Sequence, residues 1–303
     1  MEAKALEQRL RERPGDEATW GAYGGRLRDQ GDARGELIRL EHRHAHARPA
    51  DRDDLRRRID LLVEEHQEQW DAELPPGVTV VTRRHGFAVK VAVEWSDQAP
   101  ALIGQAIRGR LVTGVRVRPG AEAEDADADY YSDEPDFDEN DMPLPPPPHD
   151  ARALADLDLG GLTELDLAYF RIGDPGAEAL AAATSDGRIE TLDLRYCGVG
   201  DAGVAALCAS PAFREVRRLH LQSNRLTAEG VRALAGGFER LEELDLRYAR
   251  IGPDGARALV EAPFAGSLKR LFLYGHDVED TGVRILANAP QLPSALRSFW
   301  RSV

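Results

Sequence analysis

The sequence predicts an α/β solenoid, a curved stack of repeated units with a parallel β-sheet on its concave face and helices on its convex face. Two observations predict it. Five segments follow the pattern Leu-x-x-Leu-x-Leu, in which Ile or Val twice replaces the first Leu, and their starts lie 27, 27, 25 and 27 residues apart. Each pattern is followed at a fixed offset by an apolar residue, and then by a glycine that opens an Ala- and Val-rich stretch. A constant period of this length is typical of stacked units that bury their apolar faces only against their neighbours. The patterns begin at Leu162, Ile189, Val216, Leu241 and Leu268.

Each unit has positions for a strand, a turn and a helix. Because successive side chains of a strand point to opposite faces, we expect the last two leucines of each pattern to enter the core and the residues beside them to face outward. Cys197 and Asn224 occupy the turn, where their side chains can satisfy buried backbone groups. Four polar residues are expected to cap the helices, namely Asp174, Asp201, Thr227 and Asp280.

This pattern resembles the leucine-rich repeats of the ribonuclease-inhibitor class, in which a true helix follows each strand. The resemblance covers residues 154–299 well and residues 86–118 loosely. It implies a curved horseshoe whose concave surface binds another macromolecule, the default use of a solenoid surface.

Residues 1–72 are expected to form an N-terminal helical module of four helices, because apolar residues recur at helical spacing. Breaks at Pro14–Asp16 and Gly31–Asp32 separate the first three helices, and the fourth runs from Arg52 to Trp70. The module resembles a bacterial repeat-companion domain, a small helical module that precedes leucine-rich repeats. That resemblance implies an architecture and carries no defined activity. It rests on Pro14–Asp16, Tyr23, Leu27, Gly31–Asp32, Arg34–Leu40, Trp70 and Arg84–Phe87.

The rest of the chain divides into three parts. Residues 73–118 are expected to hold two divergent N-terminal repeats, since degenerate copies of the pattern begin at Ala88 and Val112 with a helical stretch between them. Residues 119–149 are an acidic and then proline-rich insertion that is expected to be disordered, because it has too little apolar surface to fold alone. Residues 150–303 are expected to carry the five strong repeats and a C-terminal cap, in which Leu296–Trp300 forms an edge strand.

Charge is concentrated in the insertion. The net charge is −14, and residues 121–142 contain eleven Asp or Glu and no Lys or Arg, which leaves −3 for the rest of the chain. Nucleic-acid binding is disfavoured, because it needs a basic stripe. The insertion could capture a basic partner, or it could be only a solubilising loop.

Composition favours a cytoplasmic protein. No apolar run approaches the ~20 residues that span a bilayer, so no membrane association is expected. The charged N-terminus lacks the apolar centre of a signal peptide. The strong excess of Arg over Lys suggests a GC-rich and therefore bacterial genome.

The sequence contains no motif of a catalytic site. It has no Gly-x-Ser-x-Gly, no phosphate-binding loop, no His-Glu-x-x-His and no paired Cys-x-x-Cys, so we expect no enzyme activity and no cofactor. His42 and His46 would share one helix face as a possible metal pair, but no further ligand completes a site and we expect none. Cys197 and Cys208 fall at positions expected to be buried, so neither is expected to act as a nucleophile.

The candidate binding site is the concave face. Tyr, Arg and exposed aromatic side chains are over-represented among residues that dominate binding energy. The alternative is a solvated face whose Asp and Arg pair across neighbouring strands, with at most about 1 kcal/mol per pair. The predicted protein-binding residues are Asp166, Tyr169, Asp193, Arg195, Tyr196, Arg218, His220, Asp245, Arg247, Tyr248, Arg270, Phe272 and Tyr274.

These observations predict a non-catalytic scaffold for protein–protein interaction, whose concave face binds an unknown protein partner. Two alternatives remain open at this point. One is an inhibitor or immunity-type protein that blocks an enzyme, with the acidic insertion reaching a basic active site. The other is a regulator of a small GTPase, a role that some repeats of this class have. Fold alone does not choose among them.

Overall fold

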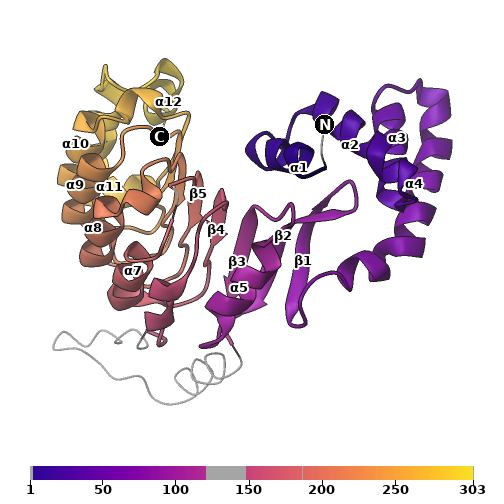
Figure 1. Cartoon of the computed structure of the whole chain (residues 1–303). Coiled ribbons are helices and arrows are strands. Elements are labelled where there is room, and N and C mark those ends of the chain that lie inside the picture. The colour runs from indigo at the N-terminus through magenta and orange to yellow at the C-terminus, as the bar shows by residue number, and fades with distance from the viewer. Residues whose placement is uncertain (1–2, 121–147, 186, 303) are drawn as a thin grey trace, which may run out of the picture. The chain divides into compact units, whose positions relative to one another are not determined.

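A computed structural model describes residues 3–120, 148–185 and 187–302 of the chain. These residues belong to two compact units. Unit 1 comprises Met1–Val93 and Leu102–Val115, and unit 2 comprises Glu94–Ala101 and Arg116–Val303 (Figure 1). The acidic insertion predicted at residues 119–149 lies outside the described residues from 121 to 147.

Unit 1 begins with four helices, as the sequence predicts. The breaks between them follow the capping residues: the side chain of Asp16 accepts a hydrogen bond from the backbone N–H of Thr19, and Asp32 accepts one from that of Arg34. The helices are α1 (Ala3–Glu12), α2 (Glu17–Asp29), α3 (Ala33–Ala45) and α4 (Pro49–Asp71).

Two apolar clusters hold these helices together. The first joins α1, α2 and α3 and includes Leu111, and the second packs α3 against α4 around Trp70. The buried members of the first cluster are Leu6, Leu10, Trp20, Tyr23, Leu27, Ile38 and Leu111.

An antiparallel hairpin follows the helices. β1 (Val78–Arg84) pairs with β2 (Phe87–Glu94). The two-residue turn between them, His85–Gly86, has positive φ at both positions (52° and 82°), the geometry that matches the twist of hairpin strands. The pairing with β1 was not predicted for this segment. The helix expected between the two divergent patterns is α5 (Ala99–Ile107), and β3 spans Gly114–Arg118.

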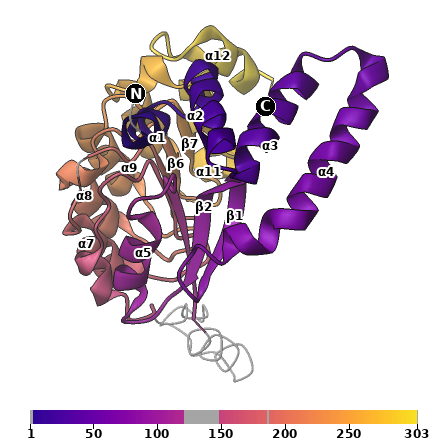
Figure 2. The ribbon, with the colours of Figure 1, turned by 45° about the vertical axis from the view of Figure 1, so that its right-hand side comes forward.

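Unit 2 contains the five strong repeats. Its strands pair in parallel and in one register, so that Leu165, Leu192, Leu219, Leu244 and Leu271 stand side by side. Helices follow the strands and lie together on one side of them; both views show α7, α8 and α9 in a row (Figures 1 and 2). The strands are β4 (Glu164–Asp166), β5 (Thr191–Asp193), β6 (Arg218–His220), β7 (Glu243–Asp245) and β8 (Arg270–Phe272). The helices are α7 (Gly173–Ala181), α8 (Asp201–Ala209), α9 (Ala228–Gly237), α10 (Gly252–Glu261) and α11 (Gly275–Asn288).

The core of unit 2 lies between these strands and helices. The paired leucines are all buried, which confirms the predicted inward direction, and full burial of such a side chain stabilises by about 1.5–3 kcal/mol. The predicted turn residues also act as expected. The Asn224 side chain accepts from the backbone N–H of Val199 (2.9 Å) and donates to the carbonyl of Leu194 (2.6 Å), while Cys197 donates to the carbonyl of Leu167.

Helix capping in unit 2 crosses from one repeat to the next. Asp174 and Asp201 were expected to cap their own helices, but each accepts backbone N–H groups at the start of the following helix. Asp174 Oδ1 accepts from Gly200 (2.6 Å) and Gly203 (2.9 Å). A Cβ at Gly203 would lie 2.6 Å from that oxygen, so the capping carboxylate needs glycine there.

Of the two remaining predicted caps, one is confirmed and one is wrong. Thr227 is the N-cap of α9 and accepts from the backbone N–H of Glu229, as predicted. The N-cap of α11 is Tyr274, whose backbone N–H donates to Asp277, and not Asp280.

The chain ends in a helix where an edge strand was predicted. α12 spans Ser294–Trp300, with Pro293 in an extended conformation immediately before it. Leu296 and Trp300 lie four residues apart and are both buried, while α12 packs on α11. A strand would have placed these two side chains on one face as well, so the short apolar pattern was ambiguous between the two periods.

Candidate functional site

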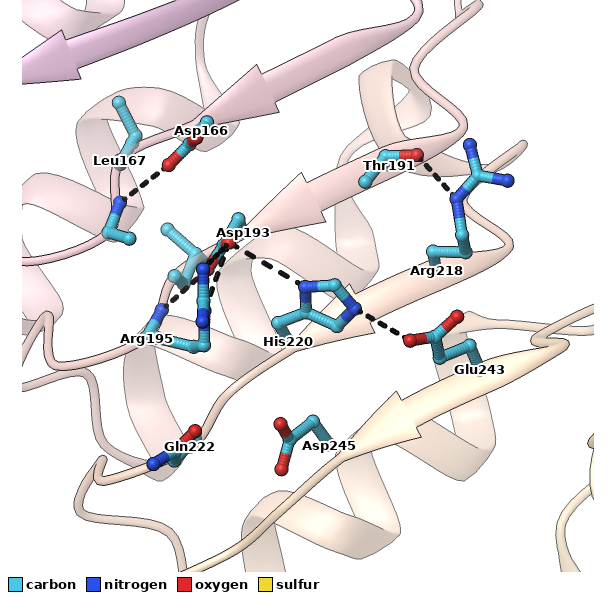
Figure 3. Close-up of polar contacts among 12 residues, drawn as sticks. Asp166, Leu167, Thr191, Asp193, Arg195, Arg218, His220, Gln222, Glu243 and Asp245 are labelled. Atoms are coloured by element: carbon cyan, nitrogen blue, oxygen red, sulfur yellow. Dashed lines mark hydrogen bonds and ion pairs between the residues drawn. The ribbon is translucent and has the colours of Figure 1, made fainter. Parts of the chain in front are cut away.

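The side of β4–β8 opposite the leucines and helices carries the predicted binding residues. We call it the polar face. It consists of the strand positions that alternate with the buried leucines, together with the residues that follow each strand (Figure 3). Its members are Glu164, Asp166, Thr191, Asp193, Arg195, Arg218, His220, Gln222, Glu243, Asp245, Arg247, Arg270, Phe272 and Tyr274.

The aspartates of the polar face are buried, which corrects the expectation that they are exposed. Asp166, Asp193 and Asp245 are only 1%, 7% and 3% exposed. Each side chain folds back over the strand end and accepts the backbone N–H two residues later, from Ala168 and from Arg195 for the first two. Asp245 makes the same turn with the N–H of Arg247. These aspartates therefore shape the turn after each strand.

Two of these carboxylates are covered by the arginine of their own turn. Arg195 donates from Nε and Nη2 to Asp193 at 2.9 and 2.6 Å, and Arg247 pairs in the same way with Asp245. Burial by itself would raise the pKa of Asp193, but hydrogen bonds from His220 and Arg195 outweigh it and hold that pKa well below its usual range. At these positions each arginine pairs with the aspartate of its own strand end, whereas the alternative of a solvated face had Asp and Arg pairing across neighbouring strands.

His220 forms the link across the strands. Its Nδ1 lies 3.6 Å from Asp193 Oδ2 on β5, and its Nε2 lies 3.2 Å from Glu243 Oε1 on β7 (Figure 3). The hydrogen bond with Asp193 raises the pKa of His220; burial opposes this shift and Glu243 adds to it. Both ring nitrogens face carboxylates, so the site favours the doubly protonated imidazolium.

Arginine side chains form the outer layer of the polar face. Arg116 reaches Asp166 Oδ2 with its Nε (2.7 Å), Arg270 pairs with Glu243, and the Nε of Arg218 donates to the hydroxyl of Thr191 (2.9 Å). Arg218 and Arg270 are exposed, whereas Asp166, Asp193, Glu243 and Asp245 are buried. The face is therefore layered, with acidic groups inside and guanidinium groups outside.

Exposed tyrosines stand at the end of the polar face. Tyr169, Tyr196 and Tyr248 directly follow the aspartate turns, in equivalent positions of three repeats, and are 59%, 37% and 52% exposed. All three have positive φ (69°, 59° and 61°). The rings of Tyr169 and Tyr196 stack with centroids 4.8 Å apart and an angle of 9°.

A second aromatic cluster lies at β7 and β8. Tyr274 contacts Tyr248 edge-on (centroids 5.1 Å apart) and stacks on His276 (5.3 Å). Phe272 is half-buried, with the guanidinium of Arg247 5.3 Å from its ring centroid. The predicted aromatic residues thus gather into two groups, and the structure places Phe272 below the surface of its group.

The list of predicted binding residues leaves out three residues of this site. Gln222 donates to the hydroxyl of Tyr196 (3.0 Å) and accepts from Arg247 (3.0 Å), so it connects the two aromatic groups. Its position after the β6 strand, equivalent to Arg195 and Arg247, was a signal that could have identified it. Arg116 was detectable in the same way from the degenerate pattern at Val112, whereas no signal pointed to His276.

The other two candidates are the His42–His46 pair and the two cysteines. The rings of His42 and His46 lie 4.6 Å apart, and His46 Nδ1 contacts the carbonyl of His42. Across the described ranges, no group of three or more His, Cys, Asp and Glu side chains is placed to hold a metal ion. Burial raises the pKa of both thiols, that of Cys208 to about 12, which keeps them protonated near neutral pH.

Comparison with known proteins identifies the repeats. A family described as leucine rich repeat matches residues 162–181, 189–208, 216–235 and 241–260. The chain therefore contains leucine-rich repeats, a family that is generally a non-catalytic interaction module. No curated protein matches the chain. None of the helices that the structure describes is long and apolar enough to cross a membrane.

Proposed function

We propose that the polar face binds a protein partner and that the chain is a non-catalytic interaction scaffold. Leucine-rich repeats commonly mediate contacts between proteins, and their extended surfaces suit that use. The exposed residues of this face are Arg and Tyr, two of the three residue types most enriched among residues that dominate binding energy.

The observation that carries the proposal is the placement of three exposed tyrosines at left-handed backbone positions. A left-handed conformation costs an L-residue about 1–2 kcal/mol, and Gly or Asn tolerates it best. Ser223 occupies the equivalent position of the β6 repeat with φ 56°, so the turn does not need an aromatic side chain. The tyrosine rings contribute largely exposed surface, and a strained residue that does little for the core supports a role in binding.

The geometry of the tyrosines suits a protein partner. A tyrosine has only two side-chain torsions and offers a large, rigid surface with a polar end, so little entropy is lost when it is bound. The stacked pair Tyr169–Tyr196 restricts that freedom further.

Several finer points belong to this proposal. A regular helix follows each of β4–β7, which supports assignment to the ribonuclease-inhibitor class and a horseshoe with the polar face as its concave side. The four helices of unit 1 support the assignment of a repeat-companion module. The free cysteines Cys197 and Cys208 support a cytoplasmic location. We also propose that the source is bacterial and that the partner is neither a nucleic acid nor a membrane. The acidic insertion has either a solubilising or a binding role.

Site-specific photo-crosslinking tests the proposal. Tyr196 and Tyr248 are replaced one at a time by p-benzoylphenylalanine in the full chain, which is then irradiated in a lysate of the source organism. The control carries the same group at Arg232, an exposed residue of α9. We expect one protein to be crosslinked from both tyrosine positions and not from the control.

Two results would contradict the proposal: crosslinks that are the same from Arg232, or an absence of crosslinks from both tyrosine positions. The identity of the captured protein also decides the alternatives. An enzyme whose activity is blocked by the chain would support the inhibitor, and a small GTPase would support the regulator.

A further inference from the structure

We propose that the polar face recognises an acidic segment of its partner, whose carboxylates bind the outer arginine layer. This inference rests on the proposed function, because it names the chemistry of the partner at the same surface. We define the arginine layer as Arg116, Arg195, Arg218, Arg247 and Arg270.

The acidic groups of the face are already engaged. Asp193 accepts from Arg195, from the backbone and from His220, and Asp245 accepts from Arg247 and from the backbone. Glu243 is 8% exposed and lies between His220 and Arg270. A basic partner would have to displace these bonds to reach a carboxylate, and it would leave buried charges without their partners.

The arginines, by contrast, keep donors for an incoming ligand. A guanidinium has five N–H groups in one plane, and Arg195 uses its Nε and Nη2 on Asp193. Within the described residues, no hydrogen bond is made by its Nη1. The buried carboxylate of Asp193 holds the Arg195 side chain in one position, so less conformational entropy is lost when a partner binds the Nη1 edge of the guanidinium.

Arg218 provides the strongest local signal. It lies in the middle strand of the five, it is exposed, and its Nε donates to the neutral hydroxyl of Thr191. No carboxylate in the part of the chain that the structure describes forms an ion pair with it. Arg270, two strands away, is 60% exposed beyond its contact with Glu243. These two guanidiniums present positive charge on the polar face, and a carboxylate bound bidentately is the ligand that fits them.

A peptide is favoured over a nucleic acid. Binding of a long nucleic acid needs a basic stripe, and outside the insertion the chain still carries a net charge of −3. A short acidic segment needs complementarity only where it docks, and the arginine layer supplies it there.

The test uses a fluorescein-labelled decaglutamate peptide titrated with the full chain at low salt, followed by fluorescence anisotropy. Decalysine and a neutral Gly-Ser peptide of equal length serve as reference probes. We expect decaglutamate alone to bind, and its binding to weaken as salt is raised. Arg218→Glu should weaken it about five- to tenfold, and Arg218→Gln by a smaller factor. Arg232→Glu on α9 makes the same change in net charge and should leave binding within about twofold.

Three results would overturn the inference. The first is no binding of decaglutamate above the neutral peptide. The second is an equal loss with Arg218→Glu and Arg232→Glu, which would reflect net charge and not this face. The third is tighter, Arg218-dependent binding of a single-stranded oligothymidylate, which would point to nucleic acid. The first two leave the proposed function intact, since crosslinks from Tyr196 and Tyr248 to a partner without an acidic segment would still support it. The third would also contradict the proposal that the partner is not a nucleic acid.

Discussion

Asp174 on α7 accepts a hydrogen bond from the backbone N–H of Gly203, 2.9 Å away and one repeat further along the chain. Asp201 repeats this relationship with Gly230 at the same distance. A helix leaves its first N–H groups without partners inside the helix, and here the preceding repeat supplies them. Neighbouring repeats therefore stabilise each other through polar bonds as well as through the shared apolar core.

The inter-repeat caps can be tested by removing one. Asp201→Ala should lower the free energy of unfolding by about 1–2 kcal/mol, because it leaves the N–H groups of Thr227 and Gly230 without an acceptor. Urea denaturation followed by circular dichroism measures the change. Asp254→Ala is the matched control, since Asp254 makes an exposed pair with Arg257 and its loss should cost about 0.5 kcal/mol or less. Equal losses in the two variants would contradict the capping role.

The alternation of faces along a strand can be tested at neighbouring residues. Leu219→Asp should abolish cooperative melting of unit 2 or lower its melting temperature severely, because it buries an unpaired carboxylate in the core. Arg218→Asp introduces the same side chain one residue earlier, on the polar face, and should change the melting temperature little. A normal melting curve for the Leu219 variant would contradict the assignment of the core.

The pH dependence of stability should report on His220. Its pKa is raised in the folded chain, so its contribution is fully present below the unfolded value near 6.5 and is lost as pH rises through the folded pKa. The groups that face it are Asp193 and Arg195 on one side and Glu243 and Arg270 on the other. Denaturation midpoints of the wild type should therefore fall between pH 6 and pH 9 by more than those of His220→Gln. Parallel profiles for the two proteins would show that His220 makes no such contribution.

Replacing a strained tyrosine should weaken binding without lowering stability. Tyr248→Asn should leave the melting temperature unchanged or slightly higher, because Asn adopts positive φ more readily. The same change should weaken binding of the crosslinked partner by about 1–3 kcal/mol, as measured by titration. Ser223→Asn, at the equivalent position without an aromatic ring, is the control: it should also leave the melting temperature unchanged or slightly higher, and it should not weaken binding. A marked loss of stability in Tyr248→Asn would mean that the ring serves the fold.

Local pattern was sufficient to predict much of the fold. The fixed spacing placed the five strands, and the alternation of side chains correctly placed Leu165 and its equivalents in the core. Cys197 and Asn224 were recognised as turn residues because a buried turn needs polar partners at one defined position. Asp16 marked a helix start for the same local reason. The cap at Asp16 acts within one helix. The bonds of Cys197 and Asn224 run to the preceding repeat, but the constant period marks their turn position in each repeat, so the pattern alone identifies them.

Packing between repeats decided the remainder. The alternation of side chains along β5 predicted that Asp193 lies on the face opposite the leucines. Its burial, however, depends on coverage by His220 and Arg195, and His220 is 27 residues away in sequence. The reach of Asp174 into the next helix, and the choice of helix over strand at Leu296–Trp300, likewise depend on neighbours that no local pattern contains. Which groups of the polar face stay exposed follows from this packing, because an exposed donor is what remains after adjacent strands have satisfied the others.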